Sequence, residues 1–326
     1  MLTMKAAMYE RYGAPEVLAV RDVPKPEPRE DEVLVAIASS TVTSACGMMR
    51  RGDTLISRLV LGLTRPRARF RVLGIEIAGT VEAVGKRVTR FKAGDRVFGF
   101  TGMRSGGNAE YVTLKENASL AHAPRGFTHE QACTLVDGPT TALFFLREKA
   151  RLQPGERIAI IGASGSIGTA AVQLARHFGA EVTAVCSGSN AELVRSLGAH
   201  HVIDYTREDF TAGGERFDVV FDTVGKSNFA AAKRALVRGG RYLLTVGGLW
   251  VPIRALLSRV FDSRRMVFGM SIEKKEALRE VAAWAEQGVL KPVIDRRYEL
   301  SAIADAHRYV ETGRKRGNVV VAVREC

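Results

Sequence analysis

The sequence predicts an α/β protein in which a β-rich, antiparallel domain is followed by a doubly wound parallel α/β domain. Two observations predict this fold class. The first third of the chain consists of short alternating runs cut by Gly and Pro, a pattern typical of closely spaced antiparallel strands. From about Ala132, apolar strand-like runs alternate with amphipathic helical segments, as in a parallel sheet covered by helices. We predict one domain at 1–121, completed by 273–326, and a second at 122–272.

In the first domain, the alternating stretches DEVLVAIASSTV, RVLGIEIAGTVEAVG, GDRVFGF and AEYVTL are expected to be strands, and MLTMKAAMYERYG contains the first strand. The stretch DVPKPEPRED is a proline-rich loop between two strands. The tail, from EKKEALREVAAWAEQGVL to NVVVAV, mixes both periods, and we expect it to return to the first domain.

In the second domain, EQACTLVDGPTTALFFLREKA is expected to be mostly helical. The runs RIAII, EVTAVC, HVIDY, FDVVFDTVG and RYLLTVGG are expected to be parallel strands. Helices connect them, including NAELVRSLGA and NFAAAKRALVRGG. Strands alternating with helices of this length favour a parallel sheet.

The composition is that of a folded globular protein, with 326 residues of which 46% are hydrophobic and 25% charged. No stretch approaches the roughly 20 apolar residues of a membrane helix, and the start lacks a signal-peptide apolar core. We therefore expect a cytoplasmic protein. The four cysteines show no paired spacing, which disfavours a disulfide framework and a structural zinc site.

The formal net charge of +13 allows two interpretations. It is consistent with an arginine-rich chain that binds a polyanionic cofactor, or with a protein that binds nucleic acid or an anionic membrane. The basic residues are scattered, and no basic run is interleaved with aromatic residues as in a single-strand binder. We therefore expect no nucleic acid or membrane partner.

The stretch IAIIGASGSIGTAAVQLARHFGAEVTAVCSG, which begins at Ile158, carries three glycines at a spacing of three. A strand before, a helix after and a second strand about 20 residues on are typical of a dinucleotide-binding turn. Gly165 lets the backbone approach a pyrophosphate, Gly168 allows close helix–strand packing, and the helix N-terminus attracts phosphate. The alternatives are a tight turn without a ligand and a serine-hydrolase elbow, whose G-x-S-x-G pattern is not met. The predicted pyrophosphate contacts are Ser164, Gly165, Ser166, Ile167 and Gly168.

The end of the second strand indicates which dinucleotide binds. An acidic residue there would select NAD, but this chain has CSGSN, so we predict NADPH beside Ser187 and Asn190. Arg195 and Tyr205 are candidate partners of the 2′-phosphate, although Arg195 is equally consistent with a solvated helix residue and Tyr205 with simple packing. The residues that end the later strands, on the nicotinamide side, are Thr223, Val224, Gly225, Val246 and Gly247.

Together with MKAAMYERYGAPEVL, FKAGDRVFGF, GGNAEYV, LGAHHVIDY and PVIDRRYEL, these stretches resemble the medium-chain dehydrogenase/reductase superfamily. The specific resemblance is to its zinc-free quinone oxidoreductase (zeta-crystallin-like) branch, and it covers nearly all of the chain. It implies a GroES-like catalytic domain, a Rossmann domain and a cofactor in the cleft between them. The implied reaction is zinc-independent transfer of hydride from NADPH to a quinone or an α,β-unsaturated carbonyl compound.

The resemblance also suggests site residues, and the chain departs from the family at several of them. Thr43 stands where zinc-containing relatives have a ligand Cys, Ile75 replaces the His of their Gly-His-Glu, and Cys46 comes three residues too late, so we expect no metal. Thr43 also replaces an Asn near the nicotinamide, and is a candidate hydrogen-bond donor to a developing oxyanion. Met48 and Asn190 fall where relatives have a substrate-side Tyr and a phosphate-binding Lys.

Three further positions follow from the same resemblance. Asp137 stands where relatives carry an apolar residue, and is either a proton relay or a helix cap. Thr141 matches a threonine that lines the cleft, and Asn318 matches a position near the cofactor. Glu76 braces the site or is purely structural.

Two apolar and basic segments, 55–70 and 249–265, resemble insertions. They frame a cleft for a small, flat, apolar electrophile, which we favour, or lie on a membrane surface. The stretch RRMVFGM (264–270) is expected at a sheet edge, where the family joins two sheets across a two-fold axis, so we predict a homodimer. The alternative function is a non-catalytic, redox-responsive NADPH-binding protein that binds nucleic acid or an anionic surface.

Overall fold

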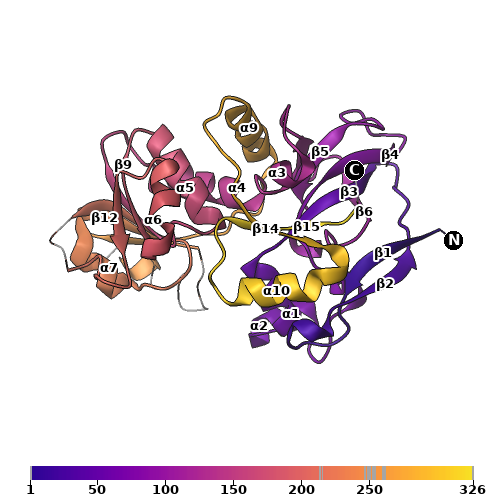
Figure 1. The fold of residues 1–326 in the computed structure, drawn as a ribbon, viewed down its shortest axis with the longest axis horizontal. Helices are drawn as coiled ribbons and strands as arrows, with labels where there is room; N and C mark the ends of the chain where they lie inside the picture. The colour runs from indigo at the N-terminus through magenta and orange to yellow at the C-terminus, as the bar shows by residue number, and fades with distance from the viewer. Residues whose placement is uncertain are drawn as a thin grey trace. The chain divides into compact units, whose positions relative to one another are not determined.

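The computed structural model describes residues 2–212, 214, 216–245, 247, 251, 255–258 and 262–324. The chain forms two compact units (Figure 1). The first comprises Met1–Asp137, Glu273–Glu286 and Pro292–Cys326, and the second comprises Gly138–Ile272 and Gln287–Lys291. The units thus divide at Asp137/Gly138, whereas the sequence pattern placed the change at 121/122. The segment in between contains a short helix, α3 (His129–Cys133), that packs against strands β3 and β4 of the first unit.

The first unit is built on a largely antiparallel sheet with the strand order β14-β15-β3-β4-β5-β7, in which β6 also pairs with β3. Only the β14–β15 pairing within this order is parallel. Strands β1 and β2 form a separate antiparallel ribbon. The bounds are β1 Thr3–Met8, β2 Ala19–Pro24, β3 Glu32–Val42, β4 Glu76–Val84, β5 Arg96–Phe100, β6 Tyr111–Lys115, β7 Leu120–His122, β14 Ile294–Glu299 and β15 Asn318–Ala322.

The long central strand β3 explains why this sheet holds together. Almost every residue of β3 is buried, and its apolar side chains share a core with those of β4, β5 and β6. A second core lies under helix α10. The other helices of the unit are α1 Ser44–Arg51, α2 Leu55–Leu61, α9 Lys275–Glu286 and α10 Ile303–Glu311. The prediction of a β-rich, largely antiparallel first domain is therefore confirmed.

The second unit contains a parallel sheet with the strand order β10-β9-β8-β11-β12-β13. The strands are β8 Arg157–Ile161, β9 Glu181–Cys186, β10 His201–Asp204, β11 Phe217–Asp222, β12 Leu236–Leu244 and β13 Arg265–Phe268. Its helices are α4 Asp137–Leu143, a π-helix at Phe144–Ala150, α5 Ser166–His177, α6 Ala191–Ser196 and α7 Phe229–Ala235. This confirms the predicted doubly wound Rossmann domain, and β13 lies at the end of the described strand order, as predicted.

One element differs from its predicted form. The stretch NFAAAKRALVRGG was predicted to be a helix throughout, but α7 ends at Ala235 and β12 begins at Leu236. Gly239 has φ +82°, a left-handed conformation that glycine adopts without strain. Gly239 lies inside β12, four residues beyond the end of α7, so it marks an irregular point of the strand and does not itself end the helix.

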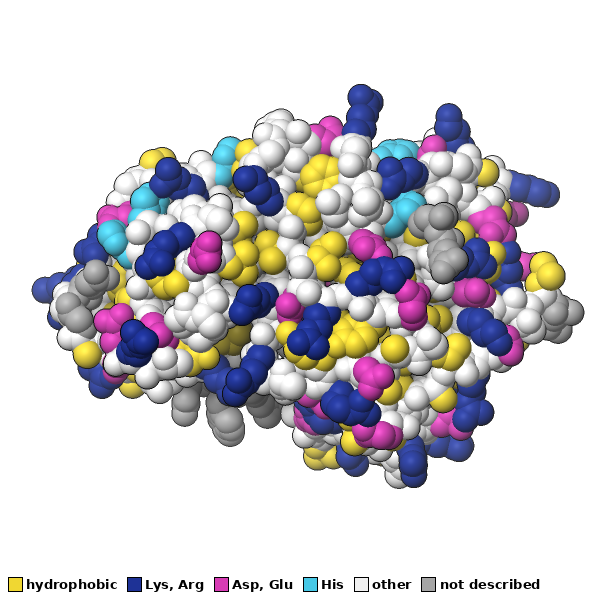
Figure 2. Space-filling model, in the orientation of Figure 1, with side chains coloured by type: hydrophobic (Ala, Val, Ile, Leu, Met, Phe, Trp, Pro, Cys, Tyr) yellow, Lys and Arg dark blue, Asp and Glu magenta, His cyan; other side chains and the backbone are white. Residues whose placement is uncertain are grey.

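Two global features can be stated for the described residues. None of their helices is long and apolar enough to span a membrane, and the cytoplasmic location stays a prediction. On the face shown in Figure 2, Lys and Arg side chains are interspersed with Asp and Glu over the whole surface, which agrees with the scattered charge of the sequence. Of the predicted insertion at 249–265, residues 249, 250, 252–254 and 259–261 lie outside the described residues.

Candidate functional site

The glycine turn of the second unit leads from β8 into α5. Gly162 has φ +75°, and its carbonyl accepts the Gly165 N–H at 3.0 Å. A Cβ on Gly168 would lie 2.1 Å from the same carbonyl oxygen, so this position excludes every residue except glycine. Gly165 is the N-cap of α5 and has no side chain with which to cap the helix. The first-turn N–H groups and the positive end of the helix dipole therefore suit an anionic ligand.

A neighbouring helix approaches the same turn closely. A Cβ on Gly138, in α4, would lie 2.7 Å from Ser166 Oγ, so α4 touches the beginning of α5 through a glycine. Thr141, on α4, is buried. The predicted residues Ser164 to Gly168 all lie in the turn or in the first turn of α5. A glycine-rich turn in front of a helix N-terminus fits the pyrophosphate of a dinucleotide.

Asn190 connects this turn to the end of the second strand. Its Nδ2 donates to Ser164 Oγ at 2.9 Å and to Ser187 Oγ at 3.2 Å, so three predicted residues meet. Asn190 Oδ1 is buried and has no hydrogen-bond partner among the described residues. This leaves an acceptor available for a ligand hydroxyl or N–H. Arg195 and Tyr205 are exposed.

A carboxylate that the sequence reading did not consider lies beside this loop. Asp204, at the end of β10, has its Oδ2 2.4 Å from where a Cβ of Gly188 would be. It accepts hydrogen bonds from the Thr206 hydroxyl and N–H, which hold the pKa of Asp204 below its usual value. Arg207 Nε is 3.7 Å from Asp204 Oδ2. Asp204 therefore stays ionised, and the exposed Arg207 offsets only part of its charge.

Asp222 organises the loop after β11. Its fully buried carboxylate accepts the N–H groups of Val224 at 3.0 Å, Gly225 at 2.7 Å, Lys226 at 3.4 Å and Ser227 at 2.8 Å. Tyr242 donates its hydroxyl to the same carboxylate at 3.1 Å, and burial beside this anion raises the pKa of Tyr242.

The predicted nicotinamide-side residues differ in their surroundings. Thr223 Oγ1 donates to the Ile161 carbonyl at 2.8 Å, which ties the loop after β11 to the end of β8. Val224 is 44% exposed at the tip of that loop. Gly247 is exposed, and Val246 lies outside the described residues.

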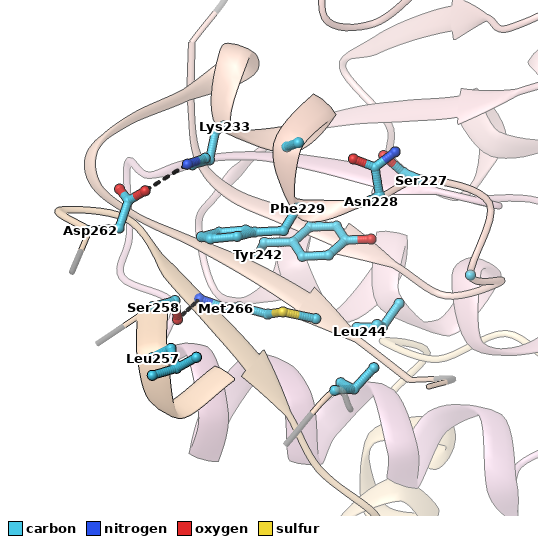
Figure 3. A pocket seen from close by; sticks show the side chains of 13 residues that line it. Ser227, Asn228, Phe229, Lys233, Tyr242, Leu244, Leu257, Ser258, Asp262 and Met266 are labelled. Carbon is cyan, nitrogen blue, oxygen red and sulfur yellow. Dashed lines mark hydrogen bonds and ion pairs between the residues drawn. The ribbon is translucent and has the colours of Figure 1, made fainter. Parts of the chain in front are cut away.

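A cavity of about 680 Å³ lies beside Tyr242, and its lining includes Gly225 and Ser227 of the loop after β11 (Figure 3). Tyr242, Phe229, Leu244 and Met266 line it with apolar surface, and the Lys233–Asp262 ion pair, 2.8 Å long, closes one end. Tyr242 therefore lines the cavity together with the loop that its hydrogen-bond partner Asp222 holds.

The first unit contains a buried polar cluster around Glu76, the first residue of β4. Glu76 is fully buried. One carboxylate oxygen accepts the Asp137 N–H at 2.7 Å, and the other accepts the Thr41 hydroxyl. Asp137 in turn forms a 3.0 Å ion pair with Lys274, whose side chain is fully buried.

Lys274 is held from several sides. Its Nζ lies 5.1 Å from the centre of the Phe100 ring, and its backbone N–H donates to Ser119 Oγ at 3.0 Å. The carboxylate and the aromatic face both attract the buried ammonium, and this attraction offsets the cost of removing Lys274 from water. These contacts account for both polar groups of Asp137. Its carboxylate pairs with the Lys274 ammonium, and its backbone N–H donates to Glu76.

Burial and the nearby Asp137 carboxylate raise the pKa of Glu76 from 4.5 to about 7. Lys315 also faces this cluster, and burial of its ammonium lowers its pKa to about 8. Lys315 Nζ donates to the Gly317 carbonyl at 2.6 Å. The cluster therefore contains groups that exchange protons near neutral pH.

Thr43 and Asn318 make local contacts. Thr43 is the N-cap of α1: its hydroxyl accepts the Cys46 N–H at 3.3 Å and lies 3.4 Å from Cys46 Sγ. Asn318 Nδ2 donates to the Val293 carbonyl at 3.2 Å. Burial raises the pKa of the Cys46 thiol. Among the residues that the structure describes, no three His, Cys, Asp or Glu side chains are grouped as ligands for a metal ion.

Sequence reasoning missed Lys274, Asp222 and Asp204. Lys274 lies in a charged run, EKKEALRE, that reads as the exposed start of a helix. Asp222 had a usable signal, because an acidic residue at a strand end before Thr-Val-Gly can accept the loop's N–H groups. Asp204 belongs to the strand next to the second strand, which the sequence does not reveal.

Comparison with known proteins matches both units to known families. Residues 29–125 match the alcohol dehydrogenase GroES-like domain family, and residues 197–321 match a family described as zinc-binding dehydrogenase. The 2-methylene-furan-3-one reductase of Solanum lycopersicum is 32% identical over 98% of this chain and 79% of its own length. The chloroplastic NADPH-dependent alkenal/one oxidoreductase of Arabidopsis thaliana is 30% identical over the same shares, 98% and 79%.

A solved structure agrees with these sequence matches. The quinone oxidoreductase from Coxiella burnetii superposes with a TM-score of 0.90 at 27% identity, covering 99% of this chain and 100% of that chain.

Proposed function

Because the chain belongs to the medium-chain dehydrogenase/reductase superfamily, in its quinone oxidoreductase branch, we propose that it reduces quinones or α,β-unsaturated carbonyl compounds with NADPH and without zinc. That it is an NAD(P)H-dependent reductase follows from the family. The observation that carries the proposal is the Gly162–Gly168 turn, which only glycine can form at Gly168 and which opens onto an uncapped helix N-terminus.

When bound, the nicotinamide cofactor supplies a hydride to an electrophilic carbon. In our proposal, the backbone from Ser164 to Gly168 binds the pyrophosphate, and Asn190 orients toward the ribose through its free acceptor. Asp222 fixes the loop carrying Thr223, Val224 and Gly225. These residues bind and orient, which is the main contribution of a protein to cofactor chemistry.

We also propose that the chain binds NADPH in preference to NADH. The end of β9 carries Ser187 and Ser189 instead of an acidic residue, and the acidic Asp204 nearby is paired with Arg207. In our proposal, the exposed Arg195 and Tyr205 bind the 2′-phosphate and offset its repulsion by Asp204, whose own charge Arg207 partly offsets.

Zinc independence rests on residue identity. Thr43 and Ile75 stand where zinc-containing relatives have ligands, and neither side chain is a good zinc ligand. An acceptor that is already electrophilic needs only hydrogen-bond donors for its developing oxyanion.

The Glu76 cluster is our candidate for holding the proton that accompanies reduction. Glu76 gains or loses a proton near pH 7, and Asp137 is both its hydrogen-bond neighbour and the partner of Lys274. The sequence alternatives for Asp137 were a relay and a cap. Its carboxylate is paired with Lys274 and raises the pKa of Glu76, so in our proposal Asp137 helps to keep a proton on Glu76 and does not carry that proton itself.

The proposal is tested by NADPH oxidation with a panel of quinones, enones and primary alcohols, before and after exhaustive chelation. We expect turnover of quinones or enones that survives chelation, and no alcohol oxidation. Stoichiometric zinc whose removal abolishes activity would refute zinc independence. Cofactor binding without turnover of any acceptor would favour the non-catalytic alternative.

Thr43 needs a separate test because it caps α1. If its hydroxyl also donates to the substrate oxyanion, Thr43→Val lowers kcat roughly ten- to a thousandfold. Thr43→Asn keeps a cap and a donor, and should retain most activity. Equal kcat for wild type and Thr43→Val would assign Thr43 to capping alone.

We further propose a homodimer that pairs through β13. This strand ends the described strand order of the second unit, and Arg265–Phe268 presents an edge on one side. Light scattering at micromolar concentration should give twice the 35.5 kDa mass of the chain, and a monomer would contradict this.

A further inference from the structure

Helix α2 and the turn after it expose a row of large apolar side chains. Leu55 is 72% exposed, Leu59 55% and Leu63 59%, and they follow one another at intervals of four residues. Val60 is 44% exposed beside them. A helix of a globular protein normally turns such a row toward the core. Here only Leu61 of the helix's described apolar side chains is fully buried, at 2%.

The segment that displays these leucines is held in a defined shape. Thr54 and Ser57 form a capping box, with hydrogen bonds of 3.2 and 3.0 Å. The Tyr12 hydroxyl donates to the Gly62 carbonyl at 2.5 Å, and the Arg67 N–H donates to the Leu61 carbonyl at 2.8 Å. The leucines are therefore presented outward by a fixed platform at the lower edge of the first unit in Figure 1.

The same segment carries charge of one sign. Residues 54–70 contain four arginines and no Asp or Glu. Arg58 is used internally, because its Nε donates to the Gly52 carbonyl at 2.9 Å and its guanidinium lies over the Tyr12 ring. Arg65, Arg67 and Arg69 are exposed in the turn that follows the leucines. An apolar row beside a cationic rim complements a surface that is apolar inside and anionic at its boundary.

We propose that residues 54–70 form a docking surface for an anionic phospholipid bilayer. Leu55, Leu59 and Leu63 enter the region between headgroups and acyl chains, and the three exposed arginines contact lipid phosphates. The sequence alone favoured a substrate cleft for this segment, and the outward leucines favour the other alternative. The attachment is to one face of the bilayer. It goes beyond the proposed reaction and does not depend on it.

The basic and the apolar residues of this surface should strengthen binding to the bilayer in different ways. Each basic residue near an anionic membrane strengthens binding about fivefold, and this attraction is screened by salt. The apolar row adds a part that salt does not screen. Binding should therefore need anionic lipid, weaken as salt rises, and require both the leucines and the arginines.

The experiment is flotation of the full chain with vesicles of phosphatidylcholine alone and of phosphatidylcholine with 30 to 40% phosphatidylglycerol, about the fraction that gives a strong surface potential. We expect flotation with the anionic vesicles only. The variants Leu55→Ser/Leu59→Ser/Leu63→Ser and Arg65→Gln/Arg67→Gln/Arg69→Gln should each lower the partition coefficient at least about tenfold.

Matched controls use residues of the same kind outside this surface. Leu2→Ser/Val20→Ser/Ile294→Ser removes three exposed apolar side chains, and Arg125→Gln/Arg238→Gln/Arg314→Gln removes three exposed arginines. Both should float like wild type. Circular dichroism and thermal melting establish that every variant is folded.

Three results would overturn the proposal. The first is no flotation with anionic vesicles at low salt. The second is a leucine variant that floats like wild type but shows a raised KM for apolar acceptors, which would assign the row to a substrate cleft. The third is a leucine variant that changes the mass in light scattering, which would mean that a second copy covers the row.

Discussion

The glycine turn of the second unit and the Glu76 cluster of the first both present polar groups, but these groups come from different sources. The turn uses backbone and glycines contiguous in sequence, and its character comes from the absence of side chains. The cluster uses the side chains of Thr41, Glu76, Asp137 and Lys274, of which Glu76 and Lys274 are fully buried and Asp137 is partly exposed. The turn therefore depends on shape, above all at Gly168, where an added Cβ would meet a carbonyl oxygen, whereas the cluster depends on charge balance.

Removal of Lys274 is the change that should break the cluster most severely. Lys274→Met fills the volume but leaves the Asp137 and Glu76 carboxylates without their buried cation. Breaking a buried ion pair typically costs about 3–5 kcal/mol, and because Asp137 is 26% exposed we expect about 3 kcal/mol. Urea unfolding measures the loss, with the half-buried neighbour in Lys275→Met as the control.

A double variant sharpens this prediction. Lys274→Met/Asp137→Asn removes both charges, so it should be more stable than Lys274→Met alone. If the single and double variants are equally unstable, the loss comes from packing around Phe100 and not from charge.

Glu76→Gln tests the proton-holding role through pH. The pKa of Glu76 is raised in the folded chain from 4.5 to about 7, so the folded state prefers the protonated carboxyl. This stabilisation is complete below about pH 4.5 and is lost as pH rises through 7, a change of up to about 3 kcal/mol. Glu76→Gln keeps the shape without the titration, so its stability should exceed that of wild type increasingly across this range.

The groups that face Glu76 are Asp137, Lys274, Lys315, Cys46 and Cys133. Comparing the two proteins at each pH cancels their contributions to first order. Parallel stability curves for wild type and Glu76→Gln between pH 4.5 and 8 would contradict the raised pKa.

Two glycine variants separate folding from binding in the turn. Gly165 has φ −82°, and an added Cβ would meet its nearest atom at 3.4 Å, so Gly165→Ala should fold normally. The methyl group would nonetheless stand where a pyrophosphate approaches, and NADPH affinity should fall about ten- to a hundredfold.

Gly168→Ala should instead destabilise the second unit by about 1–3 kcal/mol, because its Cβ meets a carbonyl oxygen. Calorimetric titration and thermal melting distinguish the two, and unchanged NADPH affinity in Gly165→Ala would refute the assigned contact.

The smallest expected effect concerns cofactor choice. Ser189 is exposed at the end of β9, and Ser189→Arg adds a cation without disturbing the buried Asn190 contacts. NADPH affinity should rise about two- to fivefold relative to NADH, as for one exposed charge pair. Ser189→Gln is the neutral control. An equal gain in affinity for NADH and NADPH would show that this loop does not contact the 2′-phosphate.

The sequence predicts the glycine turn but does not predict the Glu76 cluster. The turn was predictable because positive φ at Gly162 and the close approach at Gly168 require glycine, and glycine is visible in a sequence. The parallel strands followed from their alternation with helices. The cluster was not predictable, since Thr41, Glu76, Asp137 and Lys274 lie up to 233 positions apart (41 to 274) and meet only after the tail returns to the first unit. Even its fully buried Lys274 looks like a surface residue in the sequence.

Asp222 has a consequence for how the second unit exchanges hydrogen with solvent. Loop amides at an exposed turn normally exchange within seconds, but the N–H groups of Val224, Gly225 and Ser227 all point into a buried carboxylate. They should therefore appear among the slowly exchanging amides of the sheet, although Val224 is 44% exposed. Hydrogen–deuterium exchange measured by mass spectrometry should then show slow exchange at Val224, Gly225 and Ser227. This protection would depend on one side chain, that of Asp222.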